Sequence, residues 1–120
     1  MKRIIIILVM TAFVFACSKT DEVDPIVSIT SPTENQAFAA GQTVTVKATA
    51  TDNEGLHMIH VIVTDNTGSH WVHSEDHVDG RKFDINKTFI TTAGKIYTIH
   101  IDATDHNENV TTKEITVSTN

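Results

Sequence analysis

Strict alternation of apolar and polar side chains over residues 97–105 is the feature that most constrains the fold. The apolar side chains occupy the odd positions from 97 to 103, namely Tyr97, Ile99, Ile101 and Ala103, before the polar Asp105. The polar side chains occupy the even positions: Thr98, His100, Asp102 and Thr104. A period of two predicts a β-strand with one buried face and one wet face. This strand requires at least one more layer of structure to cover its apolar side.

Further segments repeat this pattern between runs of turn-forming residues. Residues 43–51 alternate without a fault, and the predicted strands are 26–30, 43–51, 59–63, 71–73, 83–89, 97–105 and 110–117. Residues 74–80 are polar and predict a loop. Seven short strands with no helical period indicate an all-β, seven-stranded antiparallel sandwich of the immunoglobulin or fibronectin III kind. Tyr97 lies where a tyrosine corner is expected, near the start of the penultimate strand.

The first sixteen residues predict an export signal. Met1-Lys2-Arg3 is basic, residues 4–16 are apolar except for Thr11, and Cys17 follows. The apolar run is shorter than the roughly twenty residues that span a bilayer, so it indicates a cleaved signal peptide. Val14-Phe15-Ala16-Cys17 resembles the lipobox of bacterial lipoproteins, which implies that Cys17 becomes the lipidated first residue. The alternative is ordinary cleavage near Ala16, which leaves Cys17 as a free thiol.

These boundaries divide the chain into a signal peptide (1–16), a lipidated cysteine with a solvated tether (17–24) and one folded domain (25–120). Removal of Lys2 and Arg3 moves the formal net charge from -6 to -8. A domain this acidic has no electrostatic footprint for nucleic acid. It is also repelled by anionic lipid, so the lipid chain must hold it to the membrane.

The turn and strand motifs also resemble a known family. Residues 25–32, Gly41 and the run 48–56 are similar to bacterial Ig-like domains of secreted and surface proteins, and residues 97–105 followed by Asn109 resemble their closing strands. With the lipobox, the chain resembles small single-domain Ig-like lipoproteins of Bacteroidota type, a group without an assigned activity. The resemblance implies a cell-envelope location, most simply the outer membrane. Its motifs specify a fold and carry almost no information on function.

Acidic loops suggest a metal site. In an immunoglobulin topology the loops 52–54, 75–79 and 105–109 share one pole, where they present Asp52, Glu54, Glu75, Asp76, Asp79, Asp105 and Glu108. Calcium requires six to eight oxygen ligands, and Asp52, Glu54, Asp105 and Glu108 are its candidate ligands. The simpler interpretation is that Asp, Asn and Glu are good turn formers.

Seven histidines are many for so small a domain. Zinc or copper needs three or four converging imidazoles or carboxylates. The best candidates are His73, His77 and a neighbouring acid, although scattered surface histidines are the commoner outcome. In a regular strand His70 and His73 point to opposite faces, so the run 70–77 converges only if the backbone is irregular.

Catalysis has little support, because the chain has no nucleophile elbow and no glycine-rich phosphate loop. We therefore expect a non-enzymatic, lipid-anchored binding or accessory module that recognises a protein or glycan partner. Trp71 is a candidate stacking platform for a sugar ring, with His73 and His77 beside it, or else it packs over the sheet. Metal binding and docking by strand addition at an exposed edge are the alternatives.

Overall fold

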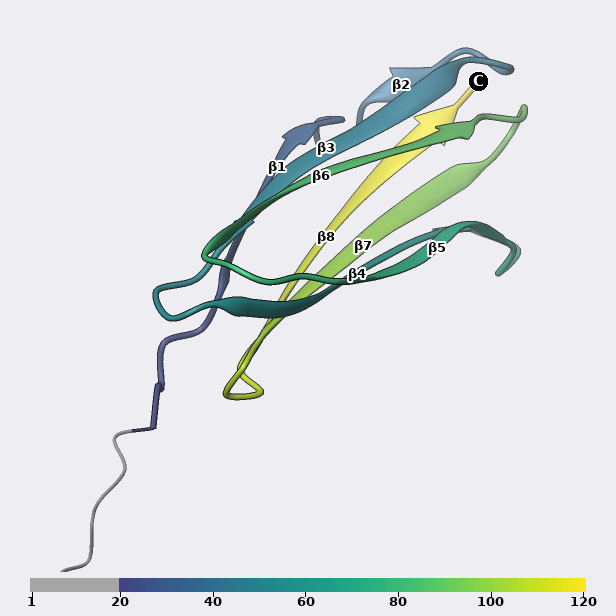
Figure 1. The fold of residues 1–120 in the computed structure, drawn as a ribbon. Helices are drawn as coiled ribbons and strands as arrows, with labels where there is room; N and C mark the ends of the chain where they lie inside the picture. The colour runs from purple at the N-terminus through teal and green to yellow at the C-terminus, as the bar shows by residue number, and fades with distance from the viewer. Residues whose placement is uncertain (1–19) are drawn as a thin grey trace, which may run out of the picture.

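The computed structural model describes residues 20–120, and within them the chain forms strands and no helix (Figure 1). The strands are β1 (Ile26–Ser31), β2 (Ala37–Phe38), β3 (Thr43–Thr51), β4 (Leu56–Asp65), β5 (His70–His77), β6 (Lys82–Ile90), β7 (Ile96–Asp105) and β8 (Val110–Thr119). Accordingly, no helix in the described part is long and apolar enough to cross a bilayer. The predicted signal peptide and Cys17 lie outside the described residues.

The strands form two sheets that pack face to face. One sheet has the order β1-β3-β6, and the other has the order β2-β8-β7-β4-β5. All neighbours are antiparallel except β2, which runs parallel to β8 over two residues. The predicted all-β sandwich is therefore confirmed. The additional strand relative to the prediction is β2, which is too short to show an alternation.

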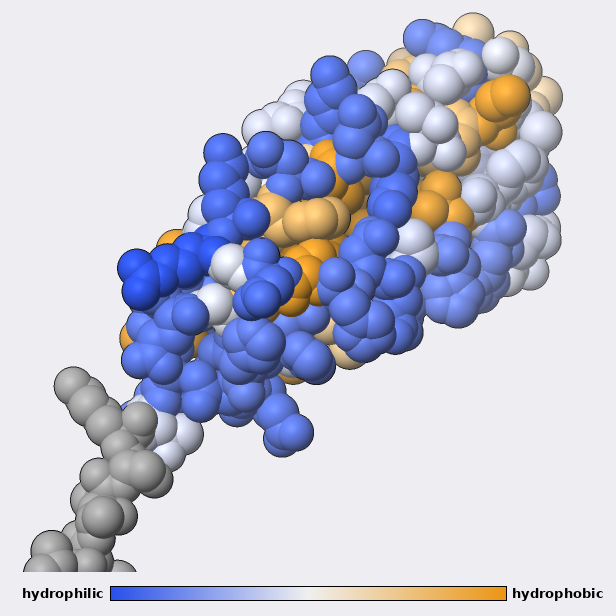
Figure 2. Space-filling view, viewed as in Figure 1, coloured by the Kyte–Doolittle hydropathy of each residue, from blue (hydrophilic) through white to orange (hydrophobic). Residues whose placement is uncertain are grey.

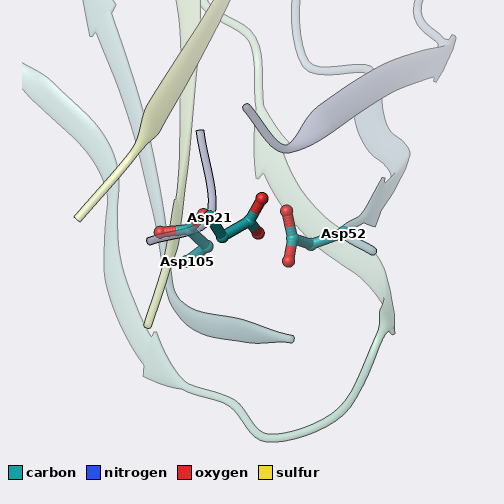
Figure 3. A group of neighbouring side chains, drawn as sticks. All are labelled: Asp21, Asp52 and Asp105. Atoms are coloured by element: carbon teal, nitrogen blue, oxygen red, sulfur yellow. The ribbon is translucent and has the colours of Figure 1, made fainter. Parts of the chain in front are cut away.

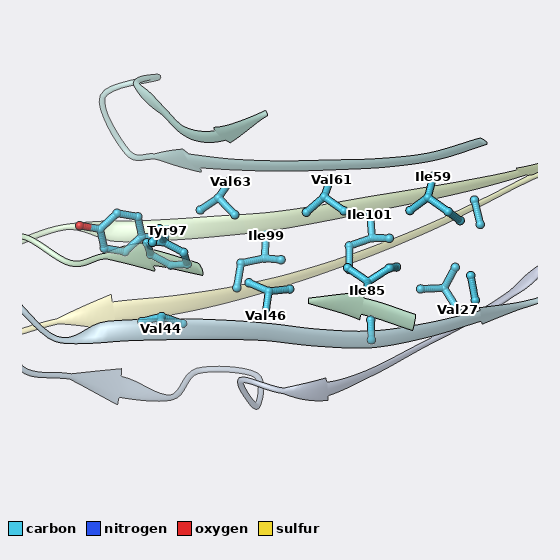
Figure 4. Close-up of a cluster of buried hydrophobic side chains, with 14 of the residues drawn as sticks. Val27, Val44, Val46, Ile59, Val61, Val63, Ile85, Tyr97, Ile99 and Ile101 are labelled. Carbon is cyan, nitrogen blue, oxygen red and sulfur yellow. The ribbon is translucent and has the colours of Figure 1, made fainter. Parts of the chain in front are cut away.

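The core lies between the inner faces of the two sheets (Figure 4). Every odd residue of β7 from Tyr97 to Ala103 is fully buried, as its alternation predicts. These side chains face the inner residues of β3 and β6, and the buried set includes Val44, Val46, Ala48, Ala50, Ile85 and Phe89. The Tyr97 hydroxyl accepts a hydrogen bond from the Thr92 backbone N–H at 2.7 Å. This is the predicted tyrosine corner, which fixes the approach to β7.

The predicted loop at residues 74–80 is wrong over most of its length, because β5 continues to His77. β5 is the edge of its sheet, and its inner face carries the polar side chain of Asp76 instead of an apolar one. There the Lys87 ammonium of β6 reaches across the open side of the sandwich to Asp76 Oδ2 at 2.9 Å. Inward-pointing charge is a common device for blunting an edge strand. Figure 2 shows apolar side chains along the seam between β6 and β5 on an otherwise largely polar face.

Three loops and the start of the described chain meet at one pole of the sandwich (Figure 1). The Leu56 N–H donates to Gly80 O at 2.8 Å, and the His106 N–H donates to Gly55 O at 3.3 Å. The Asn109 side-chain amide donates to Asp21 O at 3.1 Å, which joins the N-terminal segment to the same group. This pole therefore brings together residues from four distant parts of the sequence.

Candidate functional site

Three aspartates form a buried cluster at this pole: Asp21, Asp52 and Asp105 (Figure 3). One carboxylate oxygen of each lies within 4.8 Å of the corresponding oxygens of the other two. The residues are 8%, 7% and 1% exposed, respectively. Aspartate is rarely buried unless it is paired or coordinates a metal ion. Below, the aspartate cluster means these three side chains.

Asp105 is held by the turn that joins β7 to β8. Its Oδ1 accepts the backbone N–H groups of Asn107 and Asn109, each at 2.8 Å, and its Oδ2 accepts the Asn109 side-chain amide at 2.7 Å. Burial acts to raise the pKa of Asp105, but these hydrogen bonds from Asn109 and Asn107, helped by the charge of His106, leave the pKa below its usual value. Asp105 is therefore a carboxylate at neutral pH.

Asp52 ends β3 and shapes the turn that follows. Its Oδ2 accepts the backbone N–H groups of Glu54 at 2.9 Å and Gly55 at 2.7 Å, an arrangement typical of aspartate in turns. Its other oxygen, Oδ1, is buried and accepts no hydrogen bond within residues 20–120. The turn therefore uses only Oδ2 of this carboxylate, and the buried Oδ1 is left without a hydrogen-bond donor in the described residues.

Asp21 reaches the aspartate cluster from the segment that the sequence predicts as a solvated tether. Its Oδ1 accepts the Val23 N–H at 3.0 Å and the Asn53 side-chain amide at 3.3 Å. Its Oδ2 is buried and has no partner in the described chain. Sequence analysis missed this residue. The sandwich topology could have indicated it, because the first strand of such a sandwich starts at the pole that carries the other acidic loops.

The aspartate cluster concentrates negative charge without a matching cation. Within residues 20–120, none of its three carboxylates has a lysine, arginine or histidine nitrogen within 4.0 Å. Two carboxylates about 5 Å apart repel each other by roughly 3 kcal/mol at an effective dielectric constant of 20. A buried acceptor without a hydrogen bond costs about 1–3 kcal/mol more. A bound divalent cation would remove both penalties at once.

The donor set indicates which cation fits. All three ligands are hard carboxylate oxygens, which suit calcium or magnesium and not the softer transition metals. Three carboxylates supply three to six oxygens, so water or backbone carbonyls would complete the six to eight that calcium takes. Magnesium demands a more regular octahedron and keeps several waters of its own.

The four predicted calcium ligands are only partly brought together. Asp52 and Asp105 are members of the aspartate cluster, whereas the side chains of Glu54 and Glu108 are exposed and outside it. The two glutamates contribute their backbone instead: the Glu54 N–H donates to Asp52, and the Glu108 N–H donates to Asp105 O. Glu75 and Asp76, expected in the neighbouring loop, belong to β5.

Trp71 is committed to the fold on two sides. Its indole N–H donates to Asp65 Oδ2 at 3.0 Å, and its ring packs edge-on against Tyr97 with centroids 5.5 Å apart. Of the two roles that the sequence suggests for Trp71, these contacts correspond to packing over the sheet.

His73 and His77 do not meet each other. His73 Nε2 lies 3.1 Å from Nε2 of His60 on β4, while His77 lies beside His57 and 3.5 Å from Glu75. No group of three histidine, cysteine or acidic ligands other than the aspartate cluster converges within residues 20–120.

Solved structures with similar folds and one protein family match this chain. The fold is similar to the fibronectin(III)-like modules of CbhA from Clostridium thermocellum, with a TM-score of 0.53 and 19% sequence identity. The match covers 81% of this chain, which spans about half (48%) of the CbhA chain. A CARDB domain from Pyrococcus furiosus shares 15% identity over 78% of this chain and 87% of its own, with a TM-score of 0.49. No curated protein matches. The family model for the bacterial Ig domain matches residues 25–117. The chain therefore belongs to the bacterial Ig domain family.

Proposed function

We propose that this protein is a non-enzymatic, lipid-anchored Ig-like module of the cell envelope whose attachment to its anchor is stiffened by calcium. The observation that carries the calcium part is the pair of buried, unpartnered oxygens, Asp21 Oδ2 and Asp52 Oδ1, beside Asp105. The lipobox ending at Cys17 and the membership in the bacterial Ig domain family support the envelope location.

Calcium at the aspartate cluster would add one common link between three segments of the chain. Asp21 precedes β1, Asp52 follows β3 and Asp105 follows β7. Asp21 is four residues after Cys17 in the sequence. Four residues extend at most about 14 Å. A cation held there would fix the domain close to the lipidated residue and point this pole toward the membrane.

This orientation determines which surfaces are left for a partner. The loops 52–55 and 105–109 would face the anchor, so a protein or glycan partner would meet the sheet faces or the opposite pole. Ig-like and fibronectin III-like domains commonly serve as such binding or accessory modules. The calcium clamp would then present these surfaces in one orientation instead of on a freely rotating tether.

Calcium is expected to raise the melting temperature of the full chain, purified in detergent and stripped of metal. A ligand that binds only the folded state adds about 2.7 kcal/mol at a hundredfold excess over its dissociation constant. In a domain of this size that corresponds to a shift on the order of 10 °C. Magnesium at the same concentration should shift the midpoint less.

The Asp52→Asn substitution separates the proposed site from a general salt effect. It removes one charge from the aspartate cluster and keeps an oxygen that can accept the N–H groups of Glu54 and Gly55. We therefore expect the metal-free variant to be at least as stable as the unsubstituted chain, but to lose the calcium shift. Asp79→Asn, whose side chain is 99% exposed on the neighbouring loop, should keep the shift. Equal calcium shifts in all three proteins, or no shift in any, would refute the site.

A further inference from the structure

β6 forms an edge of the three-stranded sheet along its whole length. It pairs with β3 on one side, over nine residues without a register shift, and with no strand of the described chain on the other side. The N–H and C=O groups on that free side are a template for a further strand. The long unpaired edge that docking by strand addition requires is therefore present.

The other edge strands of the described chain are less suited to accept a strand. β1 is irregular between Ile29 and Ser31, and it is flanked by Pro25 and Pro32. β5 contains an extra residue at Trp71, and β2 is two residues long. Bulges, prolines and very short strands all protect the edges of sheets from pairing. Within residues 20–120, β6 is therefore the long and regular edge.

The seam between β6 and β5 corresponds to the place of a missing strand. A constant-type immunoglobulin sandwich has four strands in the sheet that contains its first strand, whereas this sheet has three. Residues 78–81 lead directly from β5 to β6, so the chain crosses the seam without forming the fourth strand. A strand added beside β6 would cover Val72 on β5 and Phe83 on β6, which are partly buried. It would also reach Ser74 Oγ, which is buried and has no hydrogen-bond partner in the described chain.

The charge at this edge indicates what kind of strand fits. Although the domain is acidic, the segment 81–90 has one acid, Asp84, and three basic side chains, Arg81, Lys82 and Lys87. Lys87 is paired with Asp76 across the seam, but Arg81 has no carboxylate within 4.0 Å in the described chain, and the side chain of Lys82 is 63% exposed. Two copies of β6 paired edge to edge would bring like charges together, whereas an acidic strand is complementary.

We propose that β6 accepts an extended acidic segment of a partner protein by strand addition, as the fourth strand of its sheet. Backbone hydrogen bonds to β6 would supply affinity, apolar side chains would cover the seam, and acidic side chains would meet Lys82. β6 leads away from the pole that carries the aspartate cluster, so its free edge is accessible along the sandwich (Figure 1). The proposal rests on the binding role proposed above and does not require calcium.

Titration of a labelled synthetic peptide with the full chain in detergent, in the presence of a calcium chelator, tests the proposal. The probe has nine residues, the length of β6, and alternates valine with glutamate. We expect one peptide per chain, with backbone hydrogen exchange slowed in residues 82–90 and unchanged in β1. The same peptide N-methylated at each interior residue keeps its side chains but donates no backbone hydrogen bond there. It should bind at least tenfold more weakly.

Charge reversal on the protein provides the second arm of the test. Lys82→Glu should weaken peptide binding by about tenfold, because it replaces an attraction with a repulsion. Lys113→Glu is the matched control, since Lys113 is an exposed lysine on β8 in the other sheet, and it should change the affinity by less than about twofold.

Three results would overturn strand addition at β6: no peptide binding, equal binding of the N-methylated peptide, or protection of β1 or β5 in place of β6. Because the titration excludes calcium, none of these results would affect the calcium shift of the melting temperature. Conversely, a missing calcium shift would leave peptide binding at β6 intact.

Discussion

Replacing Asp65 with alanine is expected to lower the melting temperature by about 10 °C or more. Its carboxylate accepts the backbone N–H groups of Thr67 at 2.8 Å and Ser69 at 3.1 Å, and the Trp71 indole at 3.0 Å. The Lys95 ammonium lies 3.1 Å from Oδ2. Alanine would leave these donors without an acceptor in a place where water cannot replace it fully. Thermal melts of the variant measure the loss.

The same variant should change how stability depends on acid. The hydrogen bond from the Thr67 hydroxyl, together with those from Trp71 and Lys95, outweighs burial and lowers the pKa of Asp65 far below its ordinary value of 3.8. The carboxylate therefore contributes its full stability above that ordinary pKa, and the contribution disappears as the pH falls below it. As the pH falls from about 5 to about 2, the melting temperature of Asp65→Ala should therefore decrease less than that of the unsubstituted chain.

Asp79→Ala controls for the loss of one negative charge, because Asp79 is almost fully exposed. It should leave the melting temperature and its acid dependence nearly unchanged. Parallel acid profiles for the unsubstituted chain and Asp65→Ala would contradict the assigned role of Asp65.

Replacing Ile101 with alanine is expected to reduce the free energy of unfolding by about 3–4 kcal/mol. Ile101 is fully buried on the central strand β7, where it lies opposite Val61 of β4. Truncation removes three carbons from a packed interior and leaves a cavity that neighbouring strands can close only in part. Denaturant unfolding of both proteins measures the difference.

Ile96→Ala is the matched control, since Ile96 starts the same strand but is 53% exposed. We expect a change below about 1 kcal/mol for it. If the two variants lost similar stability, the inner face of β7 would not be the centre of the core.

The strands that carry most of the core could be predicted from sequence because their two faces differ in chemistry. β3 and β7 alternate throughout, and each buries one face completely while the other stays wet. β5 could not be predicted in full, because an edge strand with Asp76 on its inner face and Lys87 across the seam has no apolar period. The polar composition of residues 74–77 is therefore the same as that of a loop, although these residues belong to β5.

An acidic site at this pole could be predicted from the sequence, but the set of residues that form it could not. Asp52 and Asp105 follow from the rule that loops of a sandwich share a pole. Asp21 depends on how the chain before β1 folds back against Asn53 and Asn109, and a polar segment gives no local sign of that packing. Exposed Glu54 and Glu108 show why acid content alone overestimates a site: their turns need the backbone, not the carboxylate.

The histidine contacts depend on register, which local pattern does not specify. His60 and His73 meet because they occupy positions two residues apart in the pairing of β4 with β5, and His70 lies beside His73 because Trp71 is an extra residue in β5. Sequence spacing within 70–77 therefore suggested His77 as the partner of His73, whereas the partner comes from another strand.

Backbone hydrogen exchange of the full chain, with and without calcium, is the measurement that tests the calcium clamp most directly. We expect calcium to slow exchange in residues 20–25, 52–55 and 105–109 together, because one ion would tie these three segments to one another. Asp52→Asn should abolish the change in all three, and Asp79→Asn should preserve it. Calcium-dependent protection confined to the two loops, with residues 20–25 unaffected, would contradict a clamp between the segment before β1 and the rest of the domain.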